Sequence, residues 1–206
     1  QVPLMRRPEV GLVFGDVRIL RRAQAGAVPI RRTAFTITPP ARGRVAEALV
    51  RGNFVPTVAV LLRRSCLERW GGFSEDSRVS ADYLAWFRIA LEHELDHVDG
   101  PVADYTLHEE GISFDLGRSL AARIALFHAE RKRTDDPAAR ALIDRLLFNL
   151  GLHLSLAALR GRARSVDRPL QLAREARSHV DRRTALWSSA SFVAHQLTNR
   201  LFRLFR

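Results

Sequence analysis

Two groups of side chains in this sequence could do chemistry, and they lie close together along the chain. Asp82 follows Ser80 at the start of an apolar stretch with helical spacing, residues 81–92. A carboxylate next to a hydroxyl group can take its proton, and the N-terminal end of a helix favours the ionised form of an acid in its first turn. The pattern by itself leaves open that Asp82 only stabilises the start of its helix.

The second group is the segment His93-Glu94-Leu95-Asp96-His97, which has the HExxH pattern. On one helical face, two such histidines could bind zinc, with Glu94 as general base. Together with Val98-Asp99-Gly100 the segment resembles the zinc-binding helix of peptide deformylases, so a zinc metallohydrolase is an alternative. Against it, Cys66 lies within Arg64-Ser-Cys-Leu-Glu68, whereas that family has a Glu-Gly-Cys-Leu-Ser segment. We favour a helix-to-strand turn flanked by His93 and His97, which bind nothing.

Alternating strands and helices are predicted through residue 113 and would position these groups. Residues 10–20 and 56–62 are rich in β-branched and apolar side chains and predict strands, the second mostly buried. Short helices are predicted over residues 43–50 and from a capping box at Ser65-Cys-Leu-Glu68. The helix 81–92 is followed by two short strands, 95–98 and 102–106. This order predicts an α/β fold.

The remainder of the chain has helical spacing over residues 116–133, 136–159 and 169–179, with Asp135-Asp136-Pro137 as a helix start. The stretch 141–159 is very apolar, but Asp144, Arg145 and other polar residues interrupt it. A buried helix is therefore favoured over a membrane span. We expect two parts, residues 1–115 and an all-helical region over residues 116–206.

The charge is unevenly distributed between these parts. Lys and Arg number 33 against 22 Asp and Glu, a net charge of +11, and residues 1–116 contain 15 of each sign. The whole excess therefore lies in residues 117–206, which suggests contact with an anionic surface. Because all basic residues except Lys132 are Arg, compositional bias of the genome explains the excess equally well. The last residues, 199–206, alternate bulky apolar residues with Arg, as in segments that lie on membranes, and a frayed helix end is an equal alternative.

The ordered motifs from Gly52 to Ser113 resemble the second half of the catalytic domain of family 2 glycosyltransferases, which have the GT-A fold. In this sequence the motifs are Gly52-Asn-Phe-Val-Pro-Thr57, Arg63-Arg64, Gly71-Gly72-Phe73, Asp82-Tyr-Leu-Ala-Trp86-Phe-Arg88 and Tyr105-Thr-Leu-His108. The resemblance covers residues 3–113 and rests on order and spacing together. It implies an incomplete GT-A-like catalytic half and inverting transfer of a sugar from a nucleotide-sugar to a hydroxyl acceptor, such as a polysaccharide or lipid-linked glycan.

The resemblance also implies roles for individual residues. It makes Asp82 the catalytic base, and it places substrate-binding groups at Asn53, Thr57, Gly72, Phe73, Trp86 and Arg88. His108 corresponds to a position that in some relatives helps to bind the metal or the diphosphate. Core packing is an equal alternative for Trp86, and an ordinary hydrogen-bonded role is an alternative for His108. The sequence has Ala81 where the family usually has Glu, so the base is retained but its supporting acid is lost.

Family members hold a divalent metal, Mg²⁺ or Mn²⁺, with an Asp-x-Asp pair in the donor-binding half. No such pair precedes Val10, and no nucleotide-binding βαβ unit is evident. We therefore expect the donor half to lie outside this sequence and the chain to be inactive alone.

The single cysteine and the lack of a signal peptide at the start predict a cytoplasmic location, and the basic residues 117–206 suggest one peripheral at the inner face of the membrane. A basic helical nucleic-acid-binding module is the non-enzymatic alternative, but no nucleic-acid-binding motif supports it.

Overall fold

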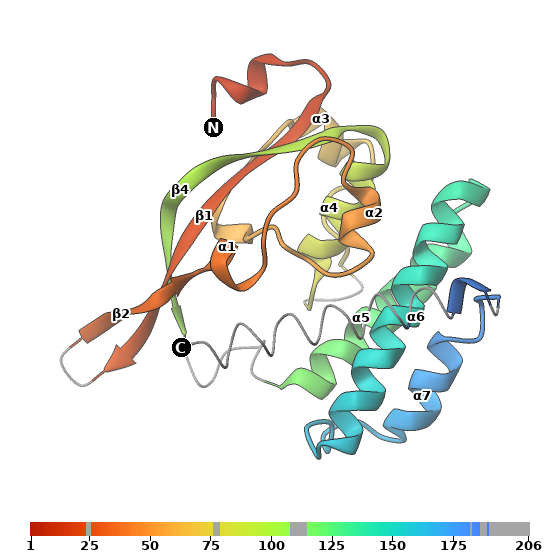
Figure 1. Cartoon of the computed structure of the whole chain (residues 1–206). Coiled ribbons are helices and arrows are strands. Elements are labelled where there is room, and N and C mark those ends of the chain that lie inside the picture. Colours follow the sequence, from red (N-terminus) through yellow and green to blue (C-terminus); the bar gives the residue numbers. More distant parts are fainter. Residues whose placement is uncertain (24–25, 76–78, 108–114, 182, 186–188, 190–206) are drawn as a thin grey trace. The chain divides into compact units, whose positions relative to one another are not determined.

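The computed structural model describes residues 1–23, 26–75, 79–107, 115–181, 183–185 and 189. The chain divides into two compact units, residues 1–114 and residues 115–206. The first is mixed α/β and contains the sheet, and the described part of the second is helical (Figure 1).

The first unit is built around a four-stranded mixed sheet. Its elements, in chain order, are a 3-10 helix η1 (Leu4–Arg6), β1 (Val10–Ala23), β2 (Gly26–Thr33), α1 (Ala34–Ile37), α2 (Ala46–Leu49), a 3-10 helix η2 (Thr57–Ala59), β3 (Val60–Leu62), α3 (Arg64–Glu68), α4 (Ala81–Glu92) and β4 (Glu94–Leu107).

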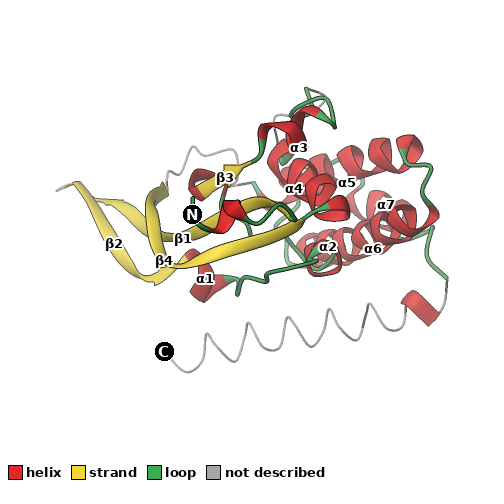
Figure 2. Ribbon diagram, turned by 90° about the horizontal axis from the view of Figure 1, so that it is seen from above, coloured by secondary structure: helices red, strands yellow, loops and turns green. Residues whose placement is uncertain are grey.

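Strand β1 is the centre of this sheet. Strand β4 pairs with it in parallel along almost its whole length, from Val10 opposite Glu94 to Arg21 opposite Leu107. On the other side of β1, β3 pairs antiparallel with the first half and β2 pairs antiparallel with the second half. The strands lie together when the molecule is seen from above (Figure 2). The first half of β1 is thus enclosed between two neighbours, as expected for its continuous apolar sequence.

The core of this unit joins β1 to α4. Val10, Leu12, Val13 and Phe14 of β1 have no exposed surface, and every residue of α4 from 83 to 90 is buried. The hydroxyl group of Tyr83 donates a hydrogen bond to the carbonyl oxygen of Leu49, which fixes the start of α4 to the end of α2. A helix buried on all sides is held in one position, so the groups in its first turn are placed rigidly.

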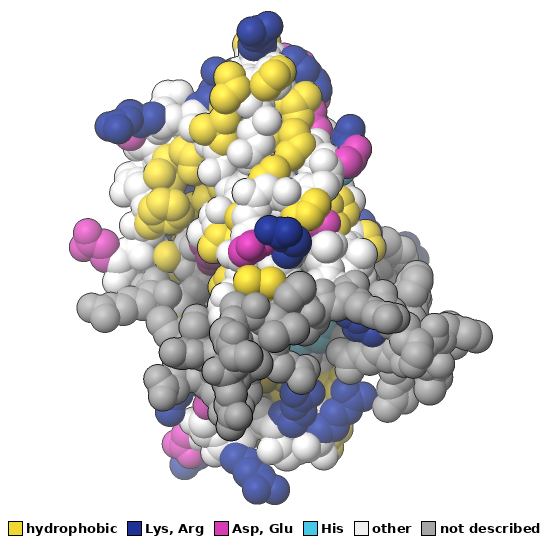
Figure 3. Space-filling view, turned by 90° about the vertical axis from the view of Figure 1, so that its left-hand side faces the viewer, with side chains coloured by type: hydrophobic (Ala, Val, Ile, Leu, Met, Phe, Trp, Pro, Cys, Tyr) yellow, Lys and Arg dark blue, Asp and Glu magenta, His cyan; other side chains and the backbone are white. Residues whose placement is uncertain are grey.

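The two ends of β4 differ in burial. Leu95, Asp96 and His97 are buried, whereas Val102 and Tyr105 are 50% and 41% exposed. Hydrophobic side chains gather on the side of the sheet seen in Figure 3, the side on which β4 lies in Figure 1. Only the first part of β4 therefore contributes to the core.

The structure confirms the strand from Val10 and the helix over residues 81–92, and it corrects three local predictions. Only residues 60–62 of the predicted strand 56–62 are strand, half-buried, because a 3-10 turn precedes them. The capping box at Ser65 is wrong, since the helix begins at Arg64 and has no side-chain cap. The two short strands after α4 are one strand, and its pairing with β1 is irregular where Gly100 and Pro101 interrupt it.

The second unit consists of α5 (Leu116–Arg133), α6 (Pro137–Leu159) and α7 (Pro169–Ala176), with α6 packed against the other two. Each of the first two helices begins with an aspartate cap: Asp115 accepts from the backbone N–H of Arg118, and Asp136 accepts from those of Ala138 and Ala139. The predicted helices and the start at Asp136 are confirmed. The predicted segment 199–206 lies outside the described residues.

Helix α6 is long and apolar enough to cross a membrane by length and composition, and 44% of its most apolar window is buried within the protein. It also approaches α7 closely: a Cβ atom added at Gly151 would lie 2.7 Å from the carbonyl oxygen of Ala173. A core helix and a membrane span can both have this composition, and the packing against α5 and α7 favours the core helix.

Candidate active site

Asp82 lies in the first turn of α4, and the Thr57 hydroxyl donates a hydrogen bond to its Oδ2 atom. Its other oxygen, Oδ1, accepts from the backbone N–H of Tyr83 at 2.7 Å. Thr57 is exposed and begins the 3-10 turn that follows Pro56, and this turn carries its side chain to α4. The structure therefore brings together two of the residues predicted to form the site.

Phe73 and Trp86 form an aromatic pair, and Trp86 lies one helical turn beyond Asp82 on α4. Trp86 is four residues after Asp82, so the two side chains share a face of the helix. The Phe73 ring meets the Trp86 ring edge-on, with centroids 5.9 Å apart and planes at 83°. Trp86 is 1% exposed, whereas Phe73 is 46% exposed. Phe73 thus presents an apolar surface supported by Trp86, which lies one helical turn from Asp82.

The backbone before Phe73 forms the turn that brings this residue to α4. Gly71 and Gly72 have φ angles of 74° and 85°, which residues other than glycine rarely adopt. The N–H of Gly72 donates to the carbonyl oxygen of Leu67 at 3.0 Å, which ends the short helix α3 and turns the chain toward α4. Gly72 therefore shapes the turn through its backbone.

Trp86 carries a buried polar atom that is not hydrogen-bonded. Its indole Nε1–H has no hydrogen-bond partner among the described residues. Leaving such a group unpaired costs about 1–3 kcal/mol. Core packing, the alternative considered for this residue, accounts for its burial but not for its unpaired donor.

Arg88 and Asn53 have local structural contacts. The Arg88 guanidinium lies 5.4 Å from the centre of the Trp70 ring and donates to the Trp70 carbonyl oxygen at 3.3 Å, with only 8% of the residue exposed. It braces the turn that leads to Phe73. The Asn53 side chain accepts from the N–H of Val55 at 3.0 Å and so holds its own loop. The predicted site residue His108 lies outside the described residues.

The HExxH segment does not lie on a helix. Helix α4 ends at Glu92, His93 caps it in an extended conformation, and strand β4 begins at Glu94. The helix-to-strand turn expected here is therefore present, and the single helical face that the zinc-hydrolase alternative requires is not formed. Among the described residues, no group of three or more His, Cys, Asp or Glu side chains is placed to hold a metal ion.

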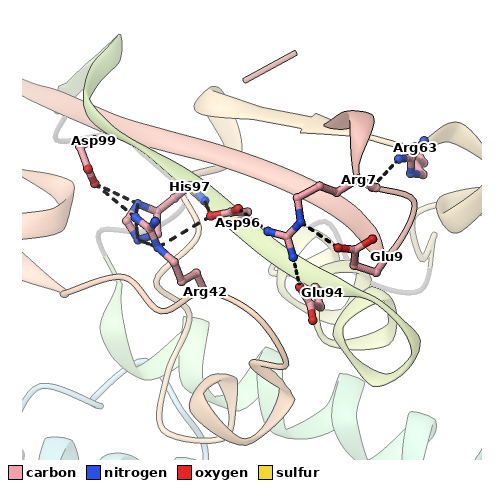
Figure 4. Close-up of polar contacts among 8 residues, drawn as sticks. All are labelled: Arg7, Glu9, Arg42, Arg63, Glu94, Asp96, His97 and Asp99. Carbon is pink, nitrogen blue, oxygen red and sulfur yellow. Dashed lines mark hydrogen bonds and ion pairs between the residues drawn. The ribbon is translucent and has the colours of Figure 1, made fainter. Parts of the chain in front are cut away.

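His97 and Asp96 instead belong to a charged network on β4 (Figure 4). Asp96 is 5% exposed, and its carboxylate accepts from Arg7 at 3.2 Å and lies 3.8 Å from Arg42. Arg7 also pairs with Glu9 and with Glu94, each at 2.8 Å. Every charged group at the centre of this network thus has an opposite charge beside it.

His97 is enclosed by aromatic and charged groups. The rings of Phe14 and Phe35 lie with their centroids 5.5 Å and 5.2 Å from the imidazole, and the Arg42 guanidinium lies 3.2 Å from Nε2. Burial lowers the pKa of His97 below its ordinary value, and the positive charge of Arg42 lowers it further. Asp99, whose carboxylate lies 3.4 Å from Nδ1, opposes this shift. The neutral imidazole is therefore the favoured form.

Sequence reasoning missed the two anchors of the site, which are the Tyr83 hydroxyl on Leu49 and the Arg88 guanidinium on Trp70. The helical spacing of the apolar residues in 81–92 could have indicated that Tyr83 faces the core. Comparison with protein-family models, with curated proteins and with solved structures finds no match for this chain. Its function is therefore inferred from the residues and their geometry.

Proposed function

We propose that residues 1–114 form the acceptor-side, catalytic-base half of an inverting glycosyltransferase similar to family 2 enzymes, with Asp82 as general base. The observation that carries the proposal is the contact between the Thr57 hydroxyl and the Asp82 carboxylate at the start of a rigidly held helix. The order of motifs in the sequence supports the same assignment.

The Asp82 carboxylate has the properties that a base for a hydroxyl acceptor needs. Each carboxylate oxygen can accept more than one hydrogen bond, so the contacts with Thr57 and with the N–H of Tyr83 leave room for a further donor. Those two contacts fix the orientation of the carboxylate, and the N-terminal end of α4 favours its negative charge. A hydroxyl group of the acceptor would take the remaining position.

The aromatic pair provides the surface on which a sugar ring could lie. One face of a sugar carries mostly C–H groups, and an exposed aromatic ring suits such a face. Phe73 is the exposed member of the pair, and it rests on Trp86, one turn of α4 from Asp82. A glycan acceptor placed on Phe73 would bring a hydroxyl group toward the carboxylate.

In the proposed reaction, Asp82 takes the proton of the acceptor hydroxyl as the oxygen attacks the anomeric carbon of the donor sugar. The new glycosidic bond forms on the face opposite the leaving group, the bond to the nucleotide diphosphate breaks, and its electron pair leaves with the diphosphate. Proton removal by a positioned base contributes about 10²–10⁴-fold to a rate. The donor and its divalent metal, Mg²⁺ or Mn²⁺, would be bound by a half that lies outside this sequence.

The test measures release of nucleotide diphosphate from a panel of nucleotide-sugars in the presence of glycan acceptors. The chain alone is expected to show no turnover. Joined to a donor-binding half, it is expected to show turnover that Asp82→Asn lowers by about 10²–10⁴-fold. Asp104→Asn is the matched control, because Asp104 is an exposed acid paired only with Arg18 in the described residues.

Two results would contradict the proposal. One is transfer by the chain alone or by the Asp82→Asn variant at the unmodified rate. The other is near-stoichiometric zinc in the purified protein that His97→Ala removes, since this would favour the metal hydrolase.

A further inference from the structure

The loop that joins α6 to α7 is rich in arginine. Residues 159–170, which we call the arginine loop, contain four arginines and a single acid, Asp167. All four arginines are exposed, and none of their side chains makes an ion pair or hydrogen bond with another described residue. They are Arg160, Arg162, Arg164 and Arg168. Charges left without partners inside the unit are available to an external anion.

The arginine loop is held in place by its non-basic residues. Ala163 is 3% exposed and packs on the start of α5, where a Cβ atom added at Gly117 would lie 2.6 Å from the Ala163 Cα atom. The Ser165 side chain lies beside Asp115, the residue that caps α5, and helps to lower the pKa of its carboxyl group. Arg162 and Arg164 stand on either side of the buried Ala163, so both are presented to solvent by an anchored backbone.

Exposed leucines mark both ends of the arginine loop. Leu159, at the end of α6, is 77% exposed, and Leu170, in the first turn of α7, is 52% exposed. Figure 1 shows the loop joining the neighbouring ends of these two helices. A large apolar side chain in water is unfavourable, and here two of them flank, in the sequence, a loop with four exposed arginines that pair with no other described residue.

We propose that the arginine loop is a docking surface for an anionic lipid membrane. Guanidinium groups bind the phosphates of lipid headgroups, and the leucines beside them enter the boundary between headgroups and acyl chains. Nucleic acid would also attract the arginines, but its phosphate backbone offers nothing to two exposed leucines. The net charge of +11 in residues 117–206 agrees with the same partner. This inference goes beyond sugar transfer and does not depend on it.

The experiment is co-sedimentation of the full chain with vesicles of phosphatidylcholine alone and of phosphatidylcholine mixed with phosphatidylserine. Binding to the mixed vesicles is expected, with release as the salt concentration rises. The triple variant Arg160→Ala, Arg162→Ala, Arg164→Ala is expected to bind on the order of 100-fold more weakly, since each arginine near an anionic surface is worth about a factor of five. The double variant Leu159→Ser, Leu170→Ser is expected to weaken binding about tenfold or more.

Two control variants remove the same charge elsewhere. Arg6→Ala, Arg51→Ala, Arg64→Ala removes three exposed arginines from the first unit, and Arg200→Ala, Arg203→Ala, Arg206→Ala removes three from the C-terminal segment. Both are expected to weaken binding much less than the loop variant does. Circular dichroism and thermal unfolding confirm that each variant is folded.

Several outcomes would overturn the proposal. Equal loss in all three arginine variants would mean a non-specific charge effect, and loss confined to the variant at 200–206 would assign the membrane contact to that segment. Binding that salt cannot reverse would point to insertion of α6. Binding to single-stranded RNA that requires the loop arginines but not the leucines, without binding to mixed vesicles, would identify a nucleic-acid surface.

Discussion

The region around Asp82 and the charged network around Asp96 show how differently acidic side chains can be used within one small unit. Asp96 is 5% exposed and lies beside Arg7 and Arg42. It belongs to a series of ion pairs that runs from Glu9 to Asp99. Asp82 has one hydroxyl donor and one backbone donor, and it lies in the first turn of its helix, one turn before the Trp86 ring that supports Phe73.

A concentration of charges is therefore not by itself a functional site. In the network around Asp96 each charge is satisfied by another, so little is left with which to bind or transfer anything. The carboxylate of Asp82 is supported by few groups and still has capacity for a ligand. We therefore expect substitutions in the network to change stability and substitutions around Asp82 to change activity.

The largest effect on stability is expected at Trp86, which belongs to the Asp82 region but is fully buried. Trp86→Ala should lower the free energy of unfolding by roughly 3–5 kcal/mol, because it leaves a large cavity beneath Phe73. Trp86→Phe keeps an aromatic ring and removes the unpaired indole N–H, so it should cost only about 1 kcal/mol. Denaturant unfolding of both variants measures the two values.

The Trp86→Phe variant also separates the effect of Trp86 on stability from its effect on acceptor binding. Because the indole N–H is buried, weaker acceptor binding at nearly unchanged stability would show that Trp86 positions Phe73 for the acceptor. Equal losses of stability in the phenylalanine and alanine variants would show that the packing around Trp86 has been misjudged.

A smaller loss of stability is expected when the network loses its buried acid. Asp96→Ala should lower the free energy of unfolding by about 2 kcal/mol, because Arg7 and Arg42 lose their shared partner while both remain partly exposed to water. Sugar transfer should be unchanged once the variant is folded. Chemical denaturation and the diphosphate-release assay test the two halves of this prediction, and a loss of transfer at full stability would place Asp96 in the site.

The smallest effect is a pH dependence of stability that comes from His97. Its pKa in the folded protein is lowered from the ordinary value of 6.5, so the folded state binds fewer protons than the unfolded state. The contribution of the neutral His97 to the free energy of unfolding should therefore be complete above pH 6.5 and decrease as the pH falls below that value. His97→Phe should flatten this slope in denaturation curves taken at a series of pH values.

His128 of the second unit must be controlled in that experiment, because burial lowers its pKa as well and gives a slope of the same sign. The comparison is therefore made in a His128→Gln background. A slope that remains unchanged after His97→Phe would mean that the imidazole is protonated in the folded state or is not enclosed as described.

The parts of the fold that sequence predicted correctly are those with strong local periodicity. The apolar spacing of α4 and the aspartate cap with Pro137 define their helices without help from the rest of the chain. Contacts between distant segments were not predictable in this way. The enclosure of His97 requires Phe14, Phe35 and Arg42, which are 55 to 83 residues away along the chain and belong to elements whose packing the sequence does not specify.

The candidate site was predictable in its residue types but not in its geometry. Thr57 was expected at the start of a strand, and it reaches Asp82 because Pro56 precedes a 3-10 turn instead. Arg88 was expected to meet substrate, and its long side chain instead covers Trp70, since a guanidinium group buried in α4 needs a partner nearby. The order of the motifs predicted the candidate region, and tertiary packing determines which of its side chains are exposed.

The role of Asp82 as general base is tested by comparing Asp82→Asn with Asp96→Asn in the chain joined to a donor-binding half. Transfer rate and free energy of unfolding are measured for each variant. We predict that Asp82→Asn loses about 10²–10⁴-fold in rate at nearly unchanged stability, and that Asp96→Asn loses stability at nearly unchanged rate. Full activity in Asp82→Asn, or an equal loss of rate in both variants, would contradict the assignment of Asp82 as the base.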